Sequence, residues 1–208
     1  MILIGCEESQ VVCAAFRKAG YEAYSCDLEA TRGNPDWHYQ QDIMEVIPTR
    51  QWDLIILHPD CTRMAVCNNK LCAKGKPQHQ GRLDDVAWTL KLWGLAKKFS
   101  KMVILENPAS VIFPHLRKAG ALVQYVQPWQ FGHMEQKKTG LALHGVKSLQ
   151  ETNNVYDEMM KLSKKERERV FYMPPSPTRK RDRSKTYQGV ADAFVSHLST
   201  HLVKREEE

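Results

Sequence analysis

The apolar stretch Asp53-Leu-Ile-Ile-Leu-His-Pro-Asp-Cys61 predicts a central strand of the fold and the residues that follow it. Four apolar residues after Asp53 indicate a short buried strand, and His58-Pro59 ends it because proline cannot donate to a sheet ladder. Cys61 therefore follows the carboxyl end of a strand. In an open α/β sheet this is the edge where ligands bind. Taken alone, such a cysteine is more often a small packed side chain than a nucleophile.

The composition is that of an ordinary soluble globular protein, with 208 residues, 42% of them hydrophobic and 26% charged. This length predicts one domain with a single well-filled core. The formal net charge of +6 favours a polyanionic partner such as DNA, because clustered lysines and arginines gain by releasing counterions from phosphates. No apolar run approaches the roughly 20 residues needed to span a bilayer, so we expect no membrane segment.

The six cysteines, with no secretory signal ahead of them, predict reduced thiols in a cytoplasmic protein; they stand at positions 6, 13, 26, 61, 67 and 72. A zinc-binding nucleic-acid adaptor is one alternative, because the spacing of His58, Cys61, Cys67 and Cys72 could enclose a tetrahedral ion. Only half of that spacing is like a standard zinc knuckle, and the strand-end argument already accounts for Cys61. We therefore expect no metal site.

The first 27 residues predict a strand, a turn, a helix and a second strand that ends in an acid. Residues 1–5 are apolar, residues 12–16 carry the apolar side of a helix, and residues 22–26 alternate as a strand does before Asp27. The roughly 20 residues from turn to acid match the layout of a nucleotide-binding half of a Rossmann fold.

The turn after the first strand differs from a phosphate-binding loop. Gly5 is its only glycine, and Glu7 and Glu8 would repel a pyrophosphate, so a cofactor with a ribose but no phosphate suits it better. Asp27 can accept two hydrogen bonds from ribose hydroxyls, or it can simply cap the next turn. Asp42 is a candidate for binding an adenine amino group, or alternatively it begins a helix.

A second buried strand, residues 101–105, runs directly into Glu106. Adjacent parallel strands lie about 5 Å apart, so the thiol of Cys61 and the carboxyl of Glu106 could face one pocket. Between them we expect a cationic loop over residues 62–82, either a lid or a solvated loop, and a helix over residues 84–98.

The second half of the chain predicts two more strands and a basic, helical end. The expected elements are strands at 123–127 and 141–146, a charged surface helix at 157–169, an extended linker at 173–178 and a final helix at 188–203. Lys138 and the basic run at 179–183 are candidates for phosphate contacts, with a solvated charged face as the alternative.

In their order along the chain, these motifs resemble the cytosine-5 DNA methyltransferases, in a compact form of the kind that phage genomes carry. Gly5, Asp27 and Asp42 are similar to the cofactor motifs of that family. Pro59-Asp60-Cys61 resembles the Pro-Pro-Cys nucleophile motif, with Asp60 as the second residue. Glu106-Asn107-Pro108 resembles Glu-Asn-Val, whose glutamate engages the target base.

Two later segments extend the resemblance over nearly the whole chain. Residues 131–140 are similar to the segment Tyr-Gly-Val-Pro-Gln with its Gln-x-Arg-x-Arg, with Gln136 and Lys138 in register and Gly140 in place of the final arginine. Gln188-Gly189 resembles the closing Gln-Ile-Gly-Asn motif. Residues 147–183 stand as a reduced, basic linker where the family has a target-recognition domain, so a protein partner or self-association could supply target recognition.

The resemblance implies a Rossmann-like, S-adenosylmethionine-dependent methyltransferase fold, with residues 1–208 as one catalytic domain. The implied reaction is methyl transfer to carbon 5 of cytosine in DNA, with Cys61 and Glu106 as catalytic residues. Implied contacts to S-adenosylmethionine come from Gly5, Glu7, Asp27, Leu28, Asp42, Ile43, His58, Gln188 and Val190. Implied substrate contacts come from Pro59, Asn107, Gln136 and Lys138.

Two alternatives to this function stay open at the level of the sequence. Asp60 places a negative charge beside a thiol that must ionise, which would raise the pKa of Cys61. Together with Gly140, this favours a catalytically inactive, methyltransferase-like nucleic-acid-binding protein. The other alternative is a related enzyme that acts on a nucleotide or uses a modified one-carbon donor.

Overall fold

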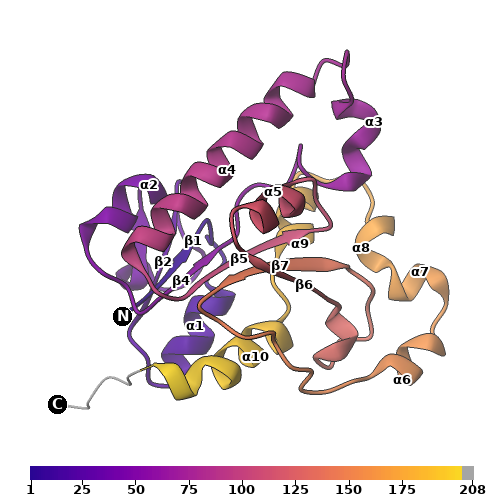
Figure 1. Ribbon diagram of the computed structural model, residues 1–208. Coiled ribbons are helices and arrows are strands. Elements are labelled where there is room, and N and C mark those ends of the chain that lie inside the picture. Colours follow the sequence, from indigo (N-terminus) through magenta and orange to yellow (C-terminus); the bar gives the residue numbers. More distant parts are fainter. Residues whose placement is uncertain (203–208) are drawn as a thin grey trace.

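The computed structural model describes residues 1–202, which form a seven-stranded sheet covered by helices on both faces (Figure 1). The strand order is β3-β2-β1-β4-β5-β7-β6. Five strands run parallel to one another: β1 (Ile2–Gly5), β2 (Ala23–Asp27), β3 (His38–Gln40), β4 (Leu54–Leu57) and β5 (Val103–Pro108). The strand β7 (Thr139–His144) is antiparallel to both β5 and β6 (Leu122–Val126). The predicted α/β class is confirmed, and the parallel part of the sheet has the predicted Rossmann-like layout.

The central strands alternate between two apolar cores, because successive side chains of a strand point to opposite faces of the sheet. One face carries Ile4, Ile56 and Ile104 and is covered by α1 (Val11–Lys18) and α10 (Gln188–Leu198). The other face carries mainly Leu3, Ile55, Leu57 and Leu105 under α2 (Ile43–Val46), α4 (His79–Phe99) and α5 (Ile112–Lys118). These runs are buried on both sides, as their continuous apolar sequence predicted.

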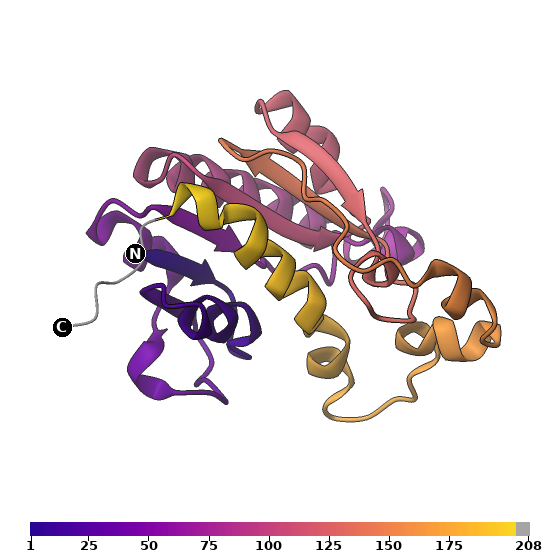
Figure 2. The ribbon, with the colours of Figure 1, turned by 90° about the horizontal axis from the view of Figure 1, so that it is seen from below.

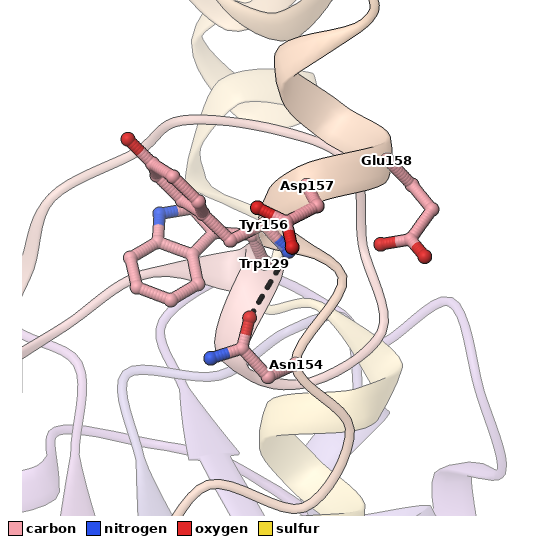
Figure 3. Close-up of a pocket in the computed structure, with 5 residues that line it drawn as sticks. All are labelled: Trp129, Asn154, Tyr156, Asp157 and Glu158. Carbon is pink, nitrogen blue, oxygen red and sulfur yellow. Dashed lines mark hydrogen bonds between the residues drawn. The ribbon is translucent and has the colours of Figure 1, made fainter.

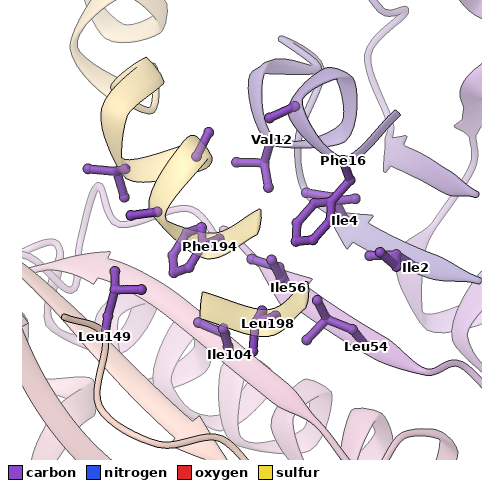
Figure 4. Packing of buried hydrophobic residues seen from close by; sticks show 14 of the residues in the cluster. Ile2, Ile4, Val12, Phe16, Leu54, Ile56, Ile104, Leu149, Phe194 and Leu198 are labelled. Atoms are coloured by element: carbon purple, nitrogen blue, oxygen red, sulfur yellow. The ribbon is translucent and has the colours of Figure 1, made fainter. Parts of the chain in front are cut away.

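The helix α10 returns the end of the chain to its beginning. Figure 2 shows α10 crossing the sheet close to α1. Phe194 and Leu198 pack into the core that Val12 and Phe16 of α1 and Ile4 of β1 also enter (Figure 4). Burying large apolar side chains such as these typically contributes about 1.5–3 kcal/mol each. The predicted final helix ends as α-helix at Leu198, followed by a 3-10 turn at Ser199–His201, and its predicted last residue, 203, lies outside the described residues.

Two expected segments differ from the structure. The expected loop at 62–82 contains a 3-10 turn (Val66–Asn68) and α3 (Asn69–Cys72), and α4 begins at His79 rather than at residue 84. The single helix expected at 157–169 was wrong, because three short helices occupy this region: α6 (Tyr156–Met160), α7 (Lys164–Arg167) and α8 (Arg169–Tyr172). Ser163 begins α7 with a capping box, in which its hydroxyl accepts from the Glu166 amide and the Glu166 carboxylate accepts from the Ser163 amide.

The remaining elements are short. The basic run at 179–183 lies in α9 (Arg179–Ser184), and further 3-10 turns occur at Pro35–Trp37, Ile47–Thr49 and Pro128–Gln130. Among the helices of residues 1–202, none is both long and apolar enough to cross a membrane.

Candidate active site

The register of the parallel strands puts four residues in one row along the carboxyl edge of the sheet. Gly5 pairs with Cys26 on one side and with Leu57 on the other, and Leu57 pairs with Leu105. The residues that follow these positions are therefore aligned in the order Asp27, Cys6, His58 and Glu106. A side chain one residue beyond each strand pair can reach its neighbour, because adjacent strands lie about 5 Å apart.

The central contact of this row joins His58 and Glu106. The imidazole Nδ1 of His58 lies 3.1 Å from Oε2 of Glu106, and the two side chains are only 10% and 14% exposed. Burial alone would lower the pKa of His58 and raise that of Glu106. The hydrogen bond and the opposite charge of the partner outweigh burial, so the pKa of His58 is raised and that of Glu106 lowered. The pair is therefore a buried imidazolium and carboxylate that share a proton.

Cys61 lies in the turn after β4, and its thiol is mostly protonated. Burial and the negative charges of Glu106 and Asp60 together raise its pKa from near 9.0 to about 11, and Lys137 opposes them. The carboxylate of Glu106 is thus close enough to alter the ionisation of the Cys61 sulfur.

The charge of Asp60 is offset by a cation from the other end of the chain. The carboxylate of Asp60 accepts hydrogen bonds from the amide and hydroxyl of Thr62, and it pairs with Nζ of Lys180 at 2.9 Å. These bonds lower the pKa of Asp60 although burial raises it. Lys180 belongs to α9, so the basic helix lies over the turn that carries Cys61. The expectation that Asp60 raises the pKa of Cys61 is confirmed.

Asn107 fixes the turn from the opposite face of β5. Its Nδ2 donates to the Pro59 carbonyl at 2.9 Å in a buried position, which ties the segment before Cys61 to the strand that carries Glu106. Within residues 1–202, Oδ1 of Asn107 is buried and has no hydrogen-bond partner. The two residues predicted to bind substrate, Pro59 and Asn107, thus form one rigid link beside the thiol.

The cation nearest this chemistry is Lys137, which the sequence analysis missed. Its charge lowers the pKa of both Cys61 and Glu106, and its Nζ donates to the carbonyl of Arg183 at 2.9 Å. Lys138, which was predicted, instead lies with Nζ 4.6 Å from the centre of the Tyr125 ring. Strand alternation is the signal that identifies Lys137. Glu106 pairs with Leu141, and Thr139 and Lys137 stand two and four residues before Leu141, so alternation places them on the same side as Leu141.

Two other predicted positions in this segment have structural constraints. The backbone amide of Gln136 donates to the carbonyl of Arg167 at 2.6 Å, which joins the strand entry to α7. At Gly140, an added Cβ would lie 2.3 Å from the ring of Phe113, which is fully buried. An arginine at position 140 therefore has no space, and the departure from the family motif follows from the packing of Phe113.

The predicted cofactor residues surround the turn after β1. Asp27 accepts from the amide of Glu29 at 3.0 Å, and Asp42 caps α2 by accepting from the amide of Met44 at 2.9 Å. The turn-capping and helix-capping alternatives are therefore both observed, although each carboxylate keeps a second oxygen. The charges of Asp27, Asp42 and Asp60 all add to burial in raising the pKa of Cys6, so these three carboxylates converge on one turn.

The buried carboxylate of Glu7 occupies the amino end of α1. It accepts from the amides of Val12 at 2.7 Å and Cys13 at 3.2 Å. A helix amino end is where a phosphate would otherwise bind, so this carboxylate excludes a pyrophosphate and fits a cofactor without one. Gly5 is also required, because an added Cβ would lie 2.7 Å from the side chain of Ile43.

The remaining predicted cofactor residues lie at the two ends of the site. Leu28 is 72% exposed just after β2, and Gln188 donates to Asp192 within α10 at 2.9 Å. Val190 is buried and lines a cavity of about 20 Å³, room for about one water molecule, that reaches Glu106. The cavity is bordered by Glu106, Val126, Gln127, Pro128, Lys137, Thr139, Thr186, Tyr187 and Val190.

A larger pocket of about 460 Å³ lies elsewhere, between the 3-10 turn Pro128–Gln130 and α6 (Figure 3). Trp129 and Tyr156 pack edge to face beside it, and Asn154 accepts from the amide of Tyr156 at 3.0 Å. Asp157 and Glu158 complete the lining. None of these five residues belongs to the row at the strand ends, so the larger pocket is separate from the Cys61 site.

The zinc alternative finds no support. Within the part of the chain that the structure describes, no three histidine, cysteine or acidic side chains are grouped so that they could hold a metal ion. Cys67 is exposed, Cys72 is buried, and His58 is bound to Glu106. All six cysteines are free thiols.

No protein-family model matches the sequence, and no curated protein matches it either. Solved structures match in part. A prophage-encoded E. coli protein described as a DNA modification methyltransferase has 11% identity and a TM-score of 0.44, over 69% of this chain and 46% of its own. The Entamoeba histolytica methyltransferase EhMeth has 12% identity and a TM-score of 0.47, over 74% and 57%. The S. pombe Dnmt2 methyltransferase has 13% identity and a TM-score of 0.42, over 78% and 54%.

This chain thus spans about half the length of those three proteins. Similarity at this level identifies no activity for this protein. The fold rests on its own sheet order, and the function is argued from the residues at the strand ends.

Proposed function

We propose that this protein transfers a methyl group from S-adenosylmethionine to carbon 5 of cytosine in DNA, through an adduct between Cys61 and the base. One observation carries the proposal. A free thiol and a buried carboxylate follow adjacent parallel strands, and the carboxylate lies close enough to raise the pKa of the thiol. Covalent activation of a pyrimidine ring needs these two groups together, one to attack the ring and one to manage its proton.

The chemistry follows from the weak nucleophilicity of carbon 5. Addition of the Cys61 thiolate to carbon 6 converts the ring into an enamine-like nucleophile, which divides one difficult step into two easier ones. Glu106 holds a proton at ring nitrogen 3 and so neutralises the charge of the adduct. Once carbon 5 carries the methyl group, loss of its proton to solvent expels the sulfur and regenerates Cys61.

The ionisation of Cys61 is the demanding part of this scheme. With a pKa of about 11, roughly one thiol in a thousand is ionised at pH 8. The cations beside it are Lys137 and Lys180, which offset the charges of Glu106 and Asp60. Because a base that binds in the site excludes water, these interactions strengthen when the substrate is bound.

The residues around the turn after β1 fit S-adenosylmethionine. Asp27 would hold the ribose hydroxyls, Asp42 with Ile43 would hold the adenine, and the turn from Gly5 to Glu7 lies between them. When bound, this cofactor supplies an electrophilic methyl group. It carries no phosphate, which agrees with the occupation of the amino end of α1 by the Glu7 carboxylate.

DNA is the proposed substrate, and the cytoplasm the proposed place of action. The chain has a net charge of +6, and α9 carries Arg179, Lys180, Arg181 and Arg183 beside the Cys61 turn. Such a basic helix suits the phosphates on either side of a target base. In a duplex the cytosine must first be flipped out of the stack, at a cost of a few kcal/mol.

The direct test is incubation with S-adenosylmethionine and several DNAs, followed by mass spectrometry of the bases. We expect 5-methylcytosine from the wild-type protein and none from Cys61→Ser. Cys67→Ser is the matched control, because Cys67 is an exposed thiol close in sequence. Full methylation by Cys61→Ser would eliminate the proposed nucleophile. Binding of DNA without any modified base would favour the inactive binding protein.

A further inference from the structure

The proposed reaction needs a proton that Glu106 does not hold by itself. In the free protein, the hydrogen bond and charge of His58 keep the Glu106 carboxyl ionised although it is buried. An ionised carboxylate can accept a hydrogen bond from the amino group of cytosine, but it has no proton to give to ring nitrogen 3. The proton must therefore come from a group in contact with Glu106.

The groups around the pair leave His58 as that source. Glu7 from the turn after β1 and Lys137 from the segment before β7 act on the pair through their charges, and Cys61 in the turn after β4 is a thiol on which the charge of Glu106 acts. Tyr187 also borders Glu106, but its hydroxyl donates to Glu135 at 2.8 Å. Among the described residues, His58 is the hydrogen-bond donor of the Glu106 carboxylate.

The second nitrogen of the imidazole supports this role. Nε2 of His58 is buried and has no hydrogen-bond partner within residues 1–202. An imidazole that only supports the fold would be expected to satisfy both nitrogens, since an unpaired buried polar atom is destabilising. Nδ1 of His58 is committed to Glu106.

Resting on the proposed function, we infer that His58 stores the proton that Glu106 delivers to ring nitrogen 3 and later recovers. As the Cys61 sulfur bonds to carbon 6, the Nδ1–H bond of His58 breaks and the proton passes through the carboxyl of Glu106 to nitrogen 3. The imidazolium becomes a neutral imidazole, and the thiol proton has already left to solvent. When the sulfur departs, the proton returns from nitrogen 3 through Glu106 to His58. His58 does not touch the base, so it is a positioning and proton-holding residue.

The storage of the proton can be measured without DNA or cofactor. In protein labelled with ¹⁵N-histidine, the ring nitrogens of His58, assigned with His58→Asn, report its protonation as the pH changes. We expect His58 to stay protonated above pH 6.5, and its pKa to fall in Glu106→Gln, because burial is then opposed only by the charge of Glu7. A His58 that is neutral at pH 6.5, or whose titration is unchanged in Glu106→Gln, would overturn the inference.

The delivery of the proton is tested by the pH dependence of covalent trapping on DNA that contains 5-fluorocytosine. In the wild-type protein the rate should rise with pH until the His58 pair loses its proton, and then stay level until the thiol itself ionises. The rate rises because the thiolate fraction of Cys61 grows with pH. It then stays level because this growth is offset by the falling fraction of protonated His58.

The variant His58→Asn separates proton storage from mere orientation. The asparagine amide can still donate to Glu106 but cannot titrate. The pH at which the trapping rate stops rising, the break in the profile, should therefore move to a lower value. The level rate should fall tenfold for each pH unit of that shift, while rates well below the break stay equal to wild type. His144→Asn is the matched control, because His144 ends β7 at the opposite edge of the sheet. It should keep the wild-type profile.

An unchanged profile in His58→Asn would show that His58 only orients Glu106 and would overturn the inference. A wild-type protein that forms no adduct with any cytosine-containing DNA would instead overturn the proposed function, and the delivery step with it. The NMR titration distinguishes the two failures, because it decides whether the pair holds the proton whatever the activity of the protein.

Discussion

The substitution Glu106→Gln should make Cys61 more reactive toward a small alkylating agent while it abolishes the reaction with DNA. The pKa of Cys61 is raised from near 9.0 to about 11, which corresponds to roughly 3 kcal/mol and a hundredfold lower thiolate fraction. Burial is the largest cause of this shift and the charge of Glu106 is the next. Removing that charge should therefore recover less than half of the shift, a gain in alkylation rate of below about tenfold.

The assay is alkylation with iodoacetamide at pH 8, with each cysteine peptide quantified by mass spectrometry over time. Cys67 is exposed and provides the internal standard in the same sample. We expect the rate at Cys61 to rise several-fold in Glu106→Gln and the rate at Cys67 to stay constant, while trapping on 5-fluorocytosine DNA is lost. An unchanged or slower alkylation of Cys61 would refute the reasoning, because the Glu106 charge would then not reach the thiol.

Three further predictions concern the fold, the buried pair and the cofactor. Gly140→Ala should lower the free energy of unfolding by about 1–3 kcal/mol in urea, because the new Cβ would overlap the buried ring of Phe113. The His58–Glu106 pair should stabilise the fold most between about pH 4.5 and 6.5. The pKa of Glu106 is lowered in the fold, so its contribution is present at pH values above the ordinary pKa of a glutamate. The pKa of His58 is raised in the fold, so its contribution is complete at pH values below the ordinary pKa of a histidine. Urea unfolding of wild type and a His58→Ala/Glu106→Ala double variant should therefore differ more at pH 5.5 than at pH 9. Asp27→Ala should weaken binding of S-adenosylmethionine, measured by calorimetry, before it affects the fold.

The glycine and aspartate predictions each have a matched control. Gly94→Ala places a Cβ in open space within α4, so it should be neutral or should stabilise by up to about 1 kcal/mol. Asp36→Ala removes an exposed acid near β3 and should leave cofactor affinity unchanged. The packing argument would be contradicted if Gly140→Ala were as stable as wild type. The argument for the buried pair would be contradicted if its contribution to stability grew toward pH 9. The cofactor argument would be contradicted if the two aspartate variants lost affinity equally.

The sequence predicted the sheet because its strands are continuous apolar runs that end in recognisable residues. Residues 54–57 and 103–105 are buried on both faces, so their pattern depends little on which neighbours they have. The helices at 156–172 were not predicted correctly, because a capping box at Ser163 and tertiary contacts divide a stretch whose charge alone suggests one helix. Local propensity is weakest where an element has little apolar surface to bury.

The sequence predicted which candidate site residues follow the ends of the strands, but it did not predict how these residues pair with one another. Cys61 and Glu106 were brought together by the argument that neighbouring parallel strands end at one edge, and in the structure the charge of Glu106 raises the pKa of Cys61. The pairing of His58 with Glu106 depends on register, which two separate strands do not specify in sequence. The choice of Lys137 over Lys138 depends on the same register, and the ion pair of Asp60 with Lys180 joins residues 120 positions apart.

The most direct test of the central claim is covalent trapping of the wild-type protein on DNA that contains 5-fluorocytosine, in the presence of S-adenosylmethionine. Fluorine at carbon 5 cannot leave as a proton does, so the adduct should accumulate as a stable protein–DNA species with the base attached to the Cys61 peptide. A bond to any other cysteine, or no adduct at all from protein that binds both DNA and cofactor, would contradict the assignment of Cys61 as the nucleophile.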